Sequence, residues 1–385
     1  MEAREDGEGM RYYVFLLMTD DQRNFNELFA HRGGLLETSK LPKPTSTFIE
    51  HFESLFSSIF EFLKQRYPKL PPVQFGVILN PSLNAFAAKS DGKYYLGLHF
   101  GALLILHDAF NKMFASRDIQ PKIGNCQLET NEKKNLSVRP ENGDLIFDPS
   151  QENVKISDPI RADLARYYTD TAVSFVILHE MCHIIRGHVG YLASKKGHAT
   201  WSEIALGSEQ QAMGNNLWQS LEMDADSFAT NHFFLLHDRN RDRFPMLIKD
   251  IKDFYSHWIF TTYVFFRLMG FNELDYESDK LFAHPPAVLR MAMVIANLRT
   301  LFDTNKRAAE GNYVMSQMGD FLEQAEKAFC SVTYFHYDPD LFKRNYLRGE
   351  SYALEIAANW NKVRPLIQPF AFGELPPMVN IIDNE

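Results

Sequence analysis

Hydrophobic residues along this chain follow two periods, a strand-like one near the N-terminus and a helical one over most of the rest. Apolar residues between Thr45 and Tyr67 recur every three or four positions and predict an amphipathic helix that ends before Pro68. Strand-like patterns predict a small early group of strands. They cover Arg11–Met18, Val73–Ala88 with a turn at residues 80–82, and Tyr94–Leu98, which follows a turn at residues 90–92.

Helical periodicity dominates the second half of the chain. Helices are predicted over Ala102–Met113, Asp163–Gly187, roughly Gln210–Leu236, Phe244–Met269, Pro286–Phe302, Tyr313–Ser331 and Ser351–Val363. Between the first two of these, Ala115–Asp158 is the most polar region and predicts a surface insertion with a small hairpin at residues 145–147. Few strands before many helices indicate an α+β fold, mainly helical with a small antiparallel sheet.

Composition limits the classes of partner. Of the 385 residues, 45% are hydrophobic and 23% are charged, which is ordinary for a globular protein. The net charge of −9 argues against a basic surface that binds nucleic acid. Only three cysteines occur, and their wide spacing favours a reducing compartment, which we take to be the cytoplasm, over a disulfide framework.

No membrane span is expected. Tyr95–Phe110 contains an apolar run that is shorter than the roughly 20 residues a spanning helix needs. Phe254–Phe271 is long enough, but it contains His257 and Arg267 and follows a charged segment. The acidic N-terminal residues 1–9 lack the features of a secretory signal. These observations predict a protein whose apolar stretches are buried in its own core.

The sequence His179-Glu180-Met181-Cys182-His183 lies in the predicted helix Asp163–Gly187. Side chains four positions apart share a helix face, so two imidazoles can bind one zinc ion, with Glu180 close to a water on that ion. Zinc lowers the pKa of such a water toward about 7, and Glu180 would accept its proton as general base. The alternative is chance, since the motif is short and the chain has 13 histidines.

A catalytic zinc site also needs a third protein ligand and an open fourth position. The segment Leu221–Asp226 has helical periodicity, and it places Glu222 and Asp226 on one face. We expect Glu222 to bind the ion and Asp226 to accept a hydrogen bond from a ligand histidine, which fixes its tautomer. Taken without the histidine motif, the two acids are more typical of a solvated helix face. The weaker candidates for a third ligand are His198, His232 and His237.

The order of these motifs resembles the gluzincin zinc metallopeptidases of the M48 type, over roughly residues 70–300. The resemblance implies a zincin-like domain. It also implies that Asn84-Ala85-Phe86-Ala87 corresponds to the family's edge strand, where an extended substrate pairs with the sheet. His284, before two prolines, would donate to the tetrahedral oxyanion, and Arg290 would orient an acidic site residue, with Glu222 as the candidate. In isolation, Asn84 is also typical of a turn and His284 of a helix start.

The sequence therefore predicts three parts: an N-terminal segment over residues 1–69, a peptidase domain over 70–305 with its insertion at about 114–160, and a helical extension over 306–385. The predicted function is a zinc-dependent endopeptidase with one Zn²⁺ per chain, acting on a protein or peptide substrate. The insertion is expected to act as a lid or to recognise a partner. The sequence leaves the oligomeric state open.

Two other classes of function remain open at this point. In a regulatory sensor or toxin-like module, the zinc site would be structural or would act on a single partner. A fourth protein ligand such as His284 would favour that reading. In a hydrolase of non-peptide amides, a closed pocket would replace the open edge strand.

Overall fold

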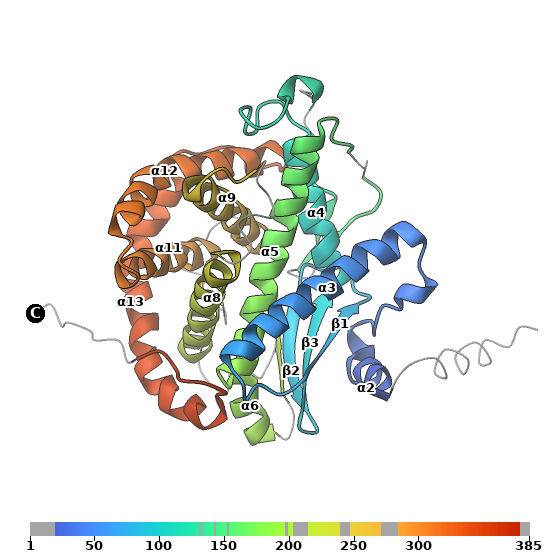
Figure 1. The fold of residues 1–385 in the computed structure, drawn as a ribbon, viewed down its shortest axis with the longest axis vertical. Coiled ribbons are helices and arrows are strands. Elements are labelled where there is room, and N and C mark those ends of the chain that lie inside the picture. Colours follow the sequence, from blue (N-terminus) through green and yellow to red (C-terminus); the bar gives the residue numbers. More distant parts are fainter. Residues whose placement is uncertain are drawn as a thin grey trace, which may run out of the picture.

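The computed structural model describes residues 20–130, 132, 134–141, 144–151, 154–196, 199–202, 215–238, 247–270 and 284–377. A small sheet lies beside a thick layer of helices (Figure 1). The mixed α+β class is therefore confirmed for this part of the chain. The strand predicted at Arg11–Met18 lies outside the described residues.

The main sheet has four strands in the order β1 (Val73–Ile78), β3 (Lys93–His99), β2 (Ala85–Ser90) and β6 (Ala199–Ser202). Strand β2 is antiparallel to both β3 and β6, whereas β1 and β3 are parallel. The prediction of an antiparallel sheet was wrong at this pair. The cause is the connection at residues 79–84, which skips one strand position so that β3 returns between β1 and β2.

The β2–β3 hairpin turns where the sequence predicts it. Asp91 and Gly92 both have positive φ angles, 49° and 75°. This pair of angles is typical of a two-residue turn whose twist matches that of the flanking strands. The turn fixes the register of β2 against β3, so that Ala85 pairs with Leu98 at the opposite end of the hairpin.

Most helices of the second half lie on one side of the long helix α5 (Pro159–Ile185), and the sheet lies on its other side (Figure 1). The predicted helices all occur, with bounds that differ by a few residues to about ten. They are α3 (Lys43–Arg66), α4 (Phe100–Phe114), α5, α8 (Asn215–Asp238), α9 (Ile251–Met269), α11 (Ala287–Thr304), α12 (Ala308–Ser331) and α13 (Leu341–Ile367). The elements α2 (Asp20–Phe29), η1 (Ala30–Arg32), α6 (His188–Lys196) and β6 were not predicted.

Residues of α5 from Thr171 to Ile185 are all buried, so this helix is the centre of the core. Apolar residues on every side explain its burial, because a helix without a polar face must be covered all round. The same hydrophobic cluster extends from Leu36 to Leu375. The predicted N-terminal segment and C-terminal extension therefore pack on one core together with the predicted central domain.

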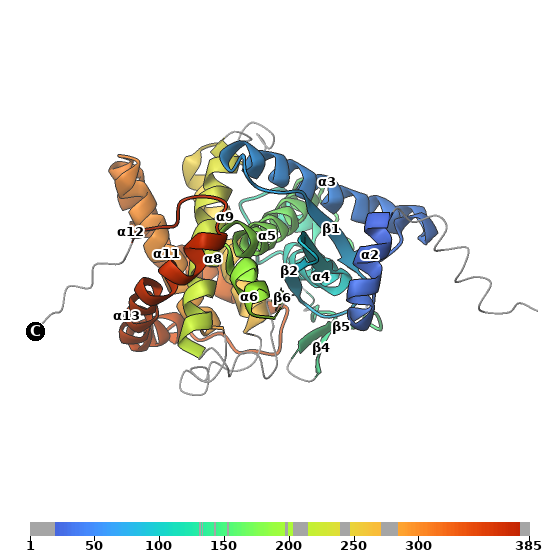
Figure 2. The same ribbon diagram turned by 90° about the horizontal axis from the view of Figure 1, so that it is seen from below.

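The two faces of the sheet pack against different layers. Ala85, Ala87 and Leu96 belong to the main core around α5, whereas Phe86 belongs to a second cluster with residues of α2. The alternation follows from the two-residue period of a strand. Figure 2 shows α2 on one side of the sheet and α5 on the other. The sheet is thus covered on both faces.

The polar region after α4 contains the predicted hairpin, formed by β4 (Val138–Glu141) and β5 (Asp144–Phe147). It is anchored by Arg161, whose guanidinium donates to backbone carbonyls between Phe114 and Ile123. A second anchor is the backbone bond of 2.8 Å from Leu83 N to Leu145 O, next to the start of β2. The insertion is therefore fastened to the sheet and to α5.

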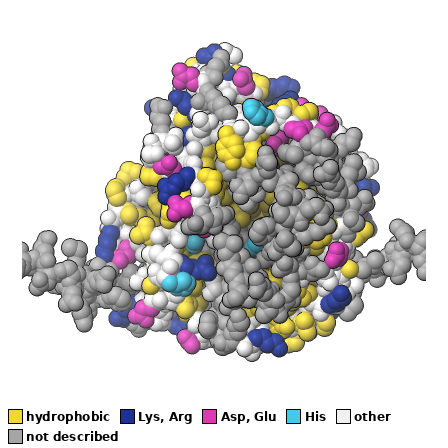
Figure 3. All heavy atoms as spheres, turned by 180° about the vertical axis from the view of Figure 1, so that it is seen from behind, with side chains coloured by type: hydrophobic (Ala, Val, Ile, Leu, Met, Phe, Trp, Pro, Cys, Tyr) yellow, Lys and Arg dark blue, Asp and Glu magenta, His cyan; other side chains and the backbone are white. Residues whose placement is uncertain are grey.

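Within the described ranges, none of the helices combines the length and apolarity needed to cross a membrane. The aromatic helix α9, which the sequence marks as the longest apolar stretch, is buried against α5 and α12. On the face opposite to that of Figure 1, acidic and basic side chains are interspersed in the described part of the surface (Figure 3). This pattern differs from the single-sign patch typical of a nucleic-acid site.

Candidate active site

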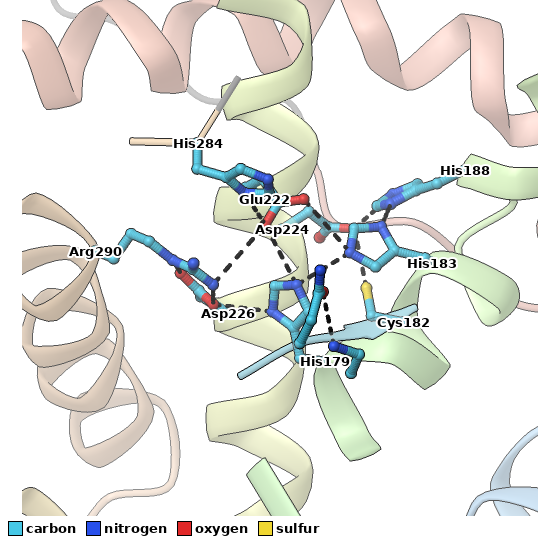
Figure 4. Close-up of polar contacts among 11 residues, drawn as sticks. His179, Cys182, His183, His188, Glu222, Asp224, Asp226, His284 and Arg290 are labelled. Carbon is cyan, nitrogen blue, oxygen red and sulfur yellow. Dashed lines mark hydrogen bonds and ion pairs between the residues drawn. The ribbon is translucent and has the colours of Figure 1, made fainter. Parts of the chain in front are cut away.

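Helices α5 and α8 bring three potential metal ligands together (Figure 4). The Nε2 atoms of His179 and His183 lie 3.1 Å apart. The Glu222 carboxylate lies 3.3 Å from His179 Nε2 through one oxygen and 3.6 Å from His183 Nε2 through the other. All three side chains are buried. The two histidines are one turn apart on α5, as the sequence predicts.

These separations fit one zinc ion. Zinc binds histidine nitrogen and carboxylate oxygen at about 2.0–2.2 Å, usually with tetrahedral geometry. Ligand atoms at those distances and angles lie about 3.3–3.6 Å apart. The two Nε2 atoms lie 3.1 Å apart, and they lie 3.3 and 3.6 Å from different oxygens of Glu222. The donor set and its spacing therefore suit a three-ligand zinc site.

The protonation states of the ligands also suit a cation. Burial holds the pKa of His183 well below its usual value, so its imidazole is neutral at pH 7. Burial alone would raise the pKa of Glu222, but His284 and His179 together hold it well below its usual range. A neutral imidazole and an ionised carboxylate are the forms that bind a metal.

Asp226, one turn beyond Glu222 on α8, supports the first histidine from behind. Its Oδ1 lies 3.0 Å from His179 Nδ1, the nitrogen that faces away from the ligand set. Arg290 of α11 donates to both oxygens of the same carboxylate, at 2.8 Å each. The closest contact of Arg290 with Glu222 is longer, at 3.8 Å. Arg290 therefore orients Asp226 in the first place, and the carboxylate in turn orients His179.

A corresponding arrangement behind His183 was not predicted. His183 Nδ1 lies 2.8 Å from His188 Nδ1, and His188 Nε2 lies 3.4 Å from an oxygen of Asp224. When His183 Nε2 binds a metal, its Nδ1 carries the proton and donates to His188, which then donates from Nε2 to Asp224. Burial alone would raise the pKa of Asp224, but the positive charge of Arg186 lowers it, and the resulting pKa lies below the usual value.

The role of His188 was missed because the helix does not continue through it. Gly187 has a φ angle of +82°, which ends α5, and α6 begins at His188. An angular step counted along an uninterrupted helix therefore places His188 wrongly. Asp224 had a visible signal, since it stands two positions after Glu222 in the same acidic segment.

A second group of potential ligands adjoins the first and consists of Cys182, His188 and Asp224. Burial, together with the negative charge of Asp224, raises the pKa of the Cys182 thiol well above its usual value, which disfavours the thiolate that a metal needs. The Arg186 guanidinium also lies 3.8 Å from Asp224. The Arg186 guanidinium already supplies a positive charge beside Asp224. The contacts among Cys182, His188 and Asp224 therefore favour support of His183 over binding of a second ion.

Glu180 and His284 complete the set of side chains that the sequence singled out. Glu180 is fully buried and follows His179 directly on α5. His284 precedes α11 and is partly exposed, and its Nδ1 lies 3.0 Å from an oxygen of Glu222. Among the described residues, the three-ligand group consists of His179, His183 and Glu222 without His284.

The predicted edge strand is not an edge. Phe86 pairs with Ser202 and Ala87 with Trp201, so β6 lies between β2 and the border of the sheet. Asn84 precedes β2, and its side-chain oxygen accepts a hydrogen bond of 2.8 Å from Ala85 N. The four-residue strand β6 was overlooked because such a short segment carries almost no periodic signal. Substrate pairing along the whole of residues 84–87 is therefore excluded while β6 is in place.

Comparison of the chain with protein-family models, curated proteins and solved structures gives no match. The resemblance to gluzincin peptidases thus rests on the motifs themselves. Any conclusion about function must come from the geometry of the site, since fold alone does not determine function.

Proposed function

We propose that the chain is a zinc metallopeptidase in which His179, His183 and Glu222 hold one zinc ion. The observation that carries the proposal is the convergence of three ligand groups: the two Nε2 atoms lie 3.1 Å apart, and the two Glu222 oxygens lie 3.3 and 3.6 Å from one of them each. Three polar side chains that met by chance in the core would cost desolvation free energy that no bound ion offsets. A bound cation explains why two imidazoles and a carboxylate face one another without intervening apolar atoms.

Glu180 is the proposed general base. Zinc bound at this site would supply Lewis-acid activation of a water molecule and of the scissile carbonyl. Glu180, adjacent to a ligand on the same helix, would accept a proton from the attacking water and later give it to the leaving amine nitrogen.

The supporting residues keep the two imidazoles in the required tautomer. Asp226 and His188 each contact the Nδ1 atom of a ligand histidine, which leaves Nε2 free of a proton for the metal. Arg290 compensates the buried charge of Asp226. These contacts hold the site in shape before the metal arrives, which reduces the cost of binding it.

His284 is the proposed donor to the oxyanion of the tetrahedral intermediate. Its Nδ1 lies against Glu222, and its Nε2 is buried and has no hydrogen-bond partner within the described part of the chain. In the imidazolium form, the ring donates from Nδ1 to Glu222 and from Nε2 to the oxyanion. Such a donor typically contributes about 3 kcal/mol to the transition state.

The substrate is proposed to be an extended polypeptide that meets the sheet at Asn84 and Ala85, just before the stretch of β2 that pairs with β6. The pairing of β6 begins at Phe86, so main-chain contacts before that point remain possible. Main-chain pairing gives affinity with little demand on sequence. A longer substrate strand would have to displace β6.

Digestion of denatured casein tests this function. Zinc-loaded wild type is compared with Glu180→Gln and with Glu61→Gln, a control on the exposed face of α3. Loss of a general base should lower the cleavage rate by about 10²–10⁴-fold. We expect this loss for Glu180→Gln with zinc still bound at one per chain, and wild-type rates for Glu61→Gln. Equal rates for all three proteins would contradict the proposal.

A structural zinc site in a sensor or toxin-like module is the second candidate. The complete burial of the ligand atoms is the observation that favours it, since catalytic metals need access for substrate. Coordination chemistry separates the two. A fourth protein ligand on zinc indicates a structural site, whereas an exchangeable fourth position indicates a catalytic one.

A further inference from the structure

A hollow of about 210 Å³ opens on the surface where α3 crosses α5 (Figure 1). Its lining comes from residues 51–59 of α3, 167–174 of α5 and 236–237 of α8. The potential zinc ligands do not belong to this lining. Side chains between packed helices normally interdigitate and leave little space, so a hollow of this size needs a cause.

Small hydroxylated side chains are the cause. Ser54 and Ser58 stand one turn apart on α3, and Thr171 and Ser174 stand one turn apart on the facing side of α5. Apart from Ser174, residues 172–178 are all apolar, so a serine at this point interrupts a continuous run. Large apolar residues at these positions would fill the space between the helices. The sequence therefore leaves room at a helix contact that could have been closed.

The floor of the hollow combines apolar surface with hydroxyl groups. Thr171 and Ser174 are 2% and 3% exposed, and Ile59 and Leu236 are buried as well. Burial raises the pKa of Tyr167 and the Thr171 hydroxyl partly opposes this, so the two hydroxyls are neighbours. Among the described residues, however, none forms a hydrogen bond with Thr171 Oγ1. A buried hydroxyl without such a bond is costly, and a ligand that bonds to it offsets the cost.

One ion pair lies at the rim of the hollow. His51 Nε2 is 2.8 Å from Asp170 Oδ1, which joins α3 to α5. The hydrogen bond with Asp170 raises the pKa of His51, so the protonated imidazole is favoured and the two charges balance. Among the described residues of the lining, Asp170 is the only acid, and no lysine or arginine occurs. A charged ligand would lose its hydration here without finding an unpaired counter-charge.

We propose that this hollow, the α3–α5 pocket, binds a neutral molecule that consists of one six-membered ring and a hydroxyl group. The ring packs on Leu55, Ile59 and Leu236. The ligand hydroxyl bonds to those of Thr171 and Ser174. Size sets the limit, because a cavity of about 150 Å³ holds benzene and about 210 Å³ leaves room for one small substituent. The inference does not rest on the proposed peptidase function.

Four probes with the same ring test the class of ligand. They are benzyl alcohol, its isostere ethylbenzene, benzylamine as a cation and benzoate as an anion. Ligand-observed NMR titrations of the full chain give the dissociation constant of each probe. Benzyl alcohol should bind about tenfold more tightly than benzylamine and benzoate, because the pocket offers no unpaired charge among its described residues. Equal or tighter binding of either charged probe, or no binding of benzyl alcohol, would overturn the assignment.

A double variant, Thr171→Val with Ser174→Ala, removes the hydroxyls from the floor with little change of shape. It should weaken benzyl alcohol binding by about tenfold and leave ethylbenzene binding nearly unchanged, because only the alcohol loses hydrogen bonds. Thr169→Val is the matched control on the same helix. Its hydroxyl donates to Ala165 O at 2.9 Å and does not line the pocket, so both affinities should stay as in wild type. Equal changes for the two probes in the double variant would refute the proposed contacts.

A second pair of variants locates the bound probe without altering the core. Ser57 and Ser58 are adjacent and exposed on α3, but of the two only Ser58 lines the pocket. Ser58→Phe should block the mouth and abolish benzyl alcohol binding, whereas Ser57→Phe should leave it unchanged. Binding that survives in Ser58→Phe, or that is lost equally in Ser57→Phe, would contradict the proposal. Zinc binding and peptide cleavage do not enter these measurements, so their outcome is distinct from that of the proposed function.

Discussion

Replacing Arg290 by methionine tests whether its ion pair with Asp226 serves the metal as well as the fold. Arg290 donates to both Asp226 oxygens at 2.8 Å, and both side chains are 3% exposed. Removing the guanidinium leaves a buried carboxylate without its main counter-charge, which typically costs about 3–5 kcal/mol of unfolding free energy. The freed Asp226 also loses its fixed orientation toward His179. Loss of such a supporting contact typically weakens metal binding by about 10–100-fold.

Arg267→Met is the matched control for this perturbation. Arg267 is also buried, pairs with the buried Glu326 at 3.0 Å, and lies over the ring of Phe329 at 4.5 Å, as Arg290 lies over that of Phe266 at 5.0 Å. Both variants should lose similar unfolding free energy in urea titrations of the zinc-free protein. Only Arg290→Met should lose zinc affinity in competition with a chelating dye. Equal zinc affinities for the two variants would refute the reasoning.

Three further predictions address the support of the site. Asp224→Asn should weaken zinc binding by about tenfold, because its amide can no longer accept from His188 as a carboxylate does; unchanged zinc affinity would contradict this. Gly187→Ala should lower unfolding free energy by at least about 1–2 kcal/mol in urea titrations, because φ is +82° and a Cβ would lie 2.6 Å from Phe370; full stability would contradict it. Burial lowers the pKa values of His99 and His232 to about 3. The two histidines together should therefore lower the unfolding free energy of the zinc-free protein by about 2.7 kcal/mol for each unit by which the pH falls between 5.5 and 4.

The sign of that pH dependence follows from linkage. A histidine with a folded pKa of about 3 stays neutral in the folded protein while the unfolded chain takes up a proton below about pH 6.5. Unfolding then binds protons, so acid lowers stability and the contribution is constant above pH 7. Urea titrations of the chelated protein check it, and equal stability at pH 7.5 and 4.5 would be incompatible with two buried neutral histidines.

The parts of the site that depend on local geometry could be predicted from the sequence. The spacing of His179 and His183 determines that they share a helix face, and the same argument relates Glu222 to Asp226. The packing of these two faces of α5 and α8 against each other was expected only because the motifs follow the order found in the gluzincin peptidases. The contact of Arg290 with Asp226 was expected only as a contact with some acid of the site, since spacing along the chain cannot select between two carboxylates one turn apart.

The parts that depend on distant pairing could not be predicted. The parallel pairing of β1 with β3 follows from where the chain returns, and no local pattern encodes it. The strand β6 pairs with a segment more than a hundred residues earlier and thereby removes the predicted edge at Phe86 and Ala87. Arg32 reaches Phe86 only because Gly33 and Gly34 turn the chain beside β1. In each case the determining contact is one between elements, which a periodic pattern does not specify.

Anomalous diffraction at the zinc absorption edge, from crystals of the zinc-loaded protein, tests the central claim most directly. The account predicts one zinc ion per chain, about 2.0–2.2 Å from His179 Nε2, His183 Nε2 and a Glu222 oxygen, with a fourth position not filled by protein. Zinc bound instead by Cys182, His188 and Asp224, or closed off by His284 as a fourth ligand, would contradict it.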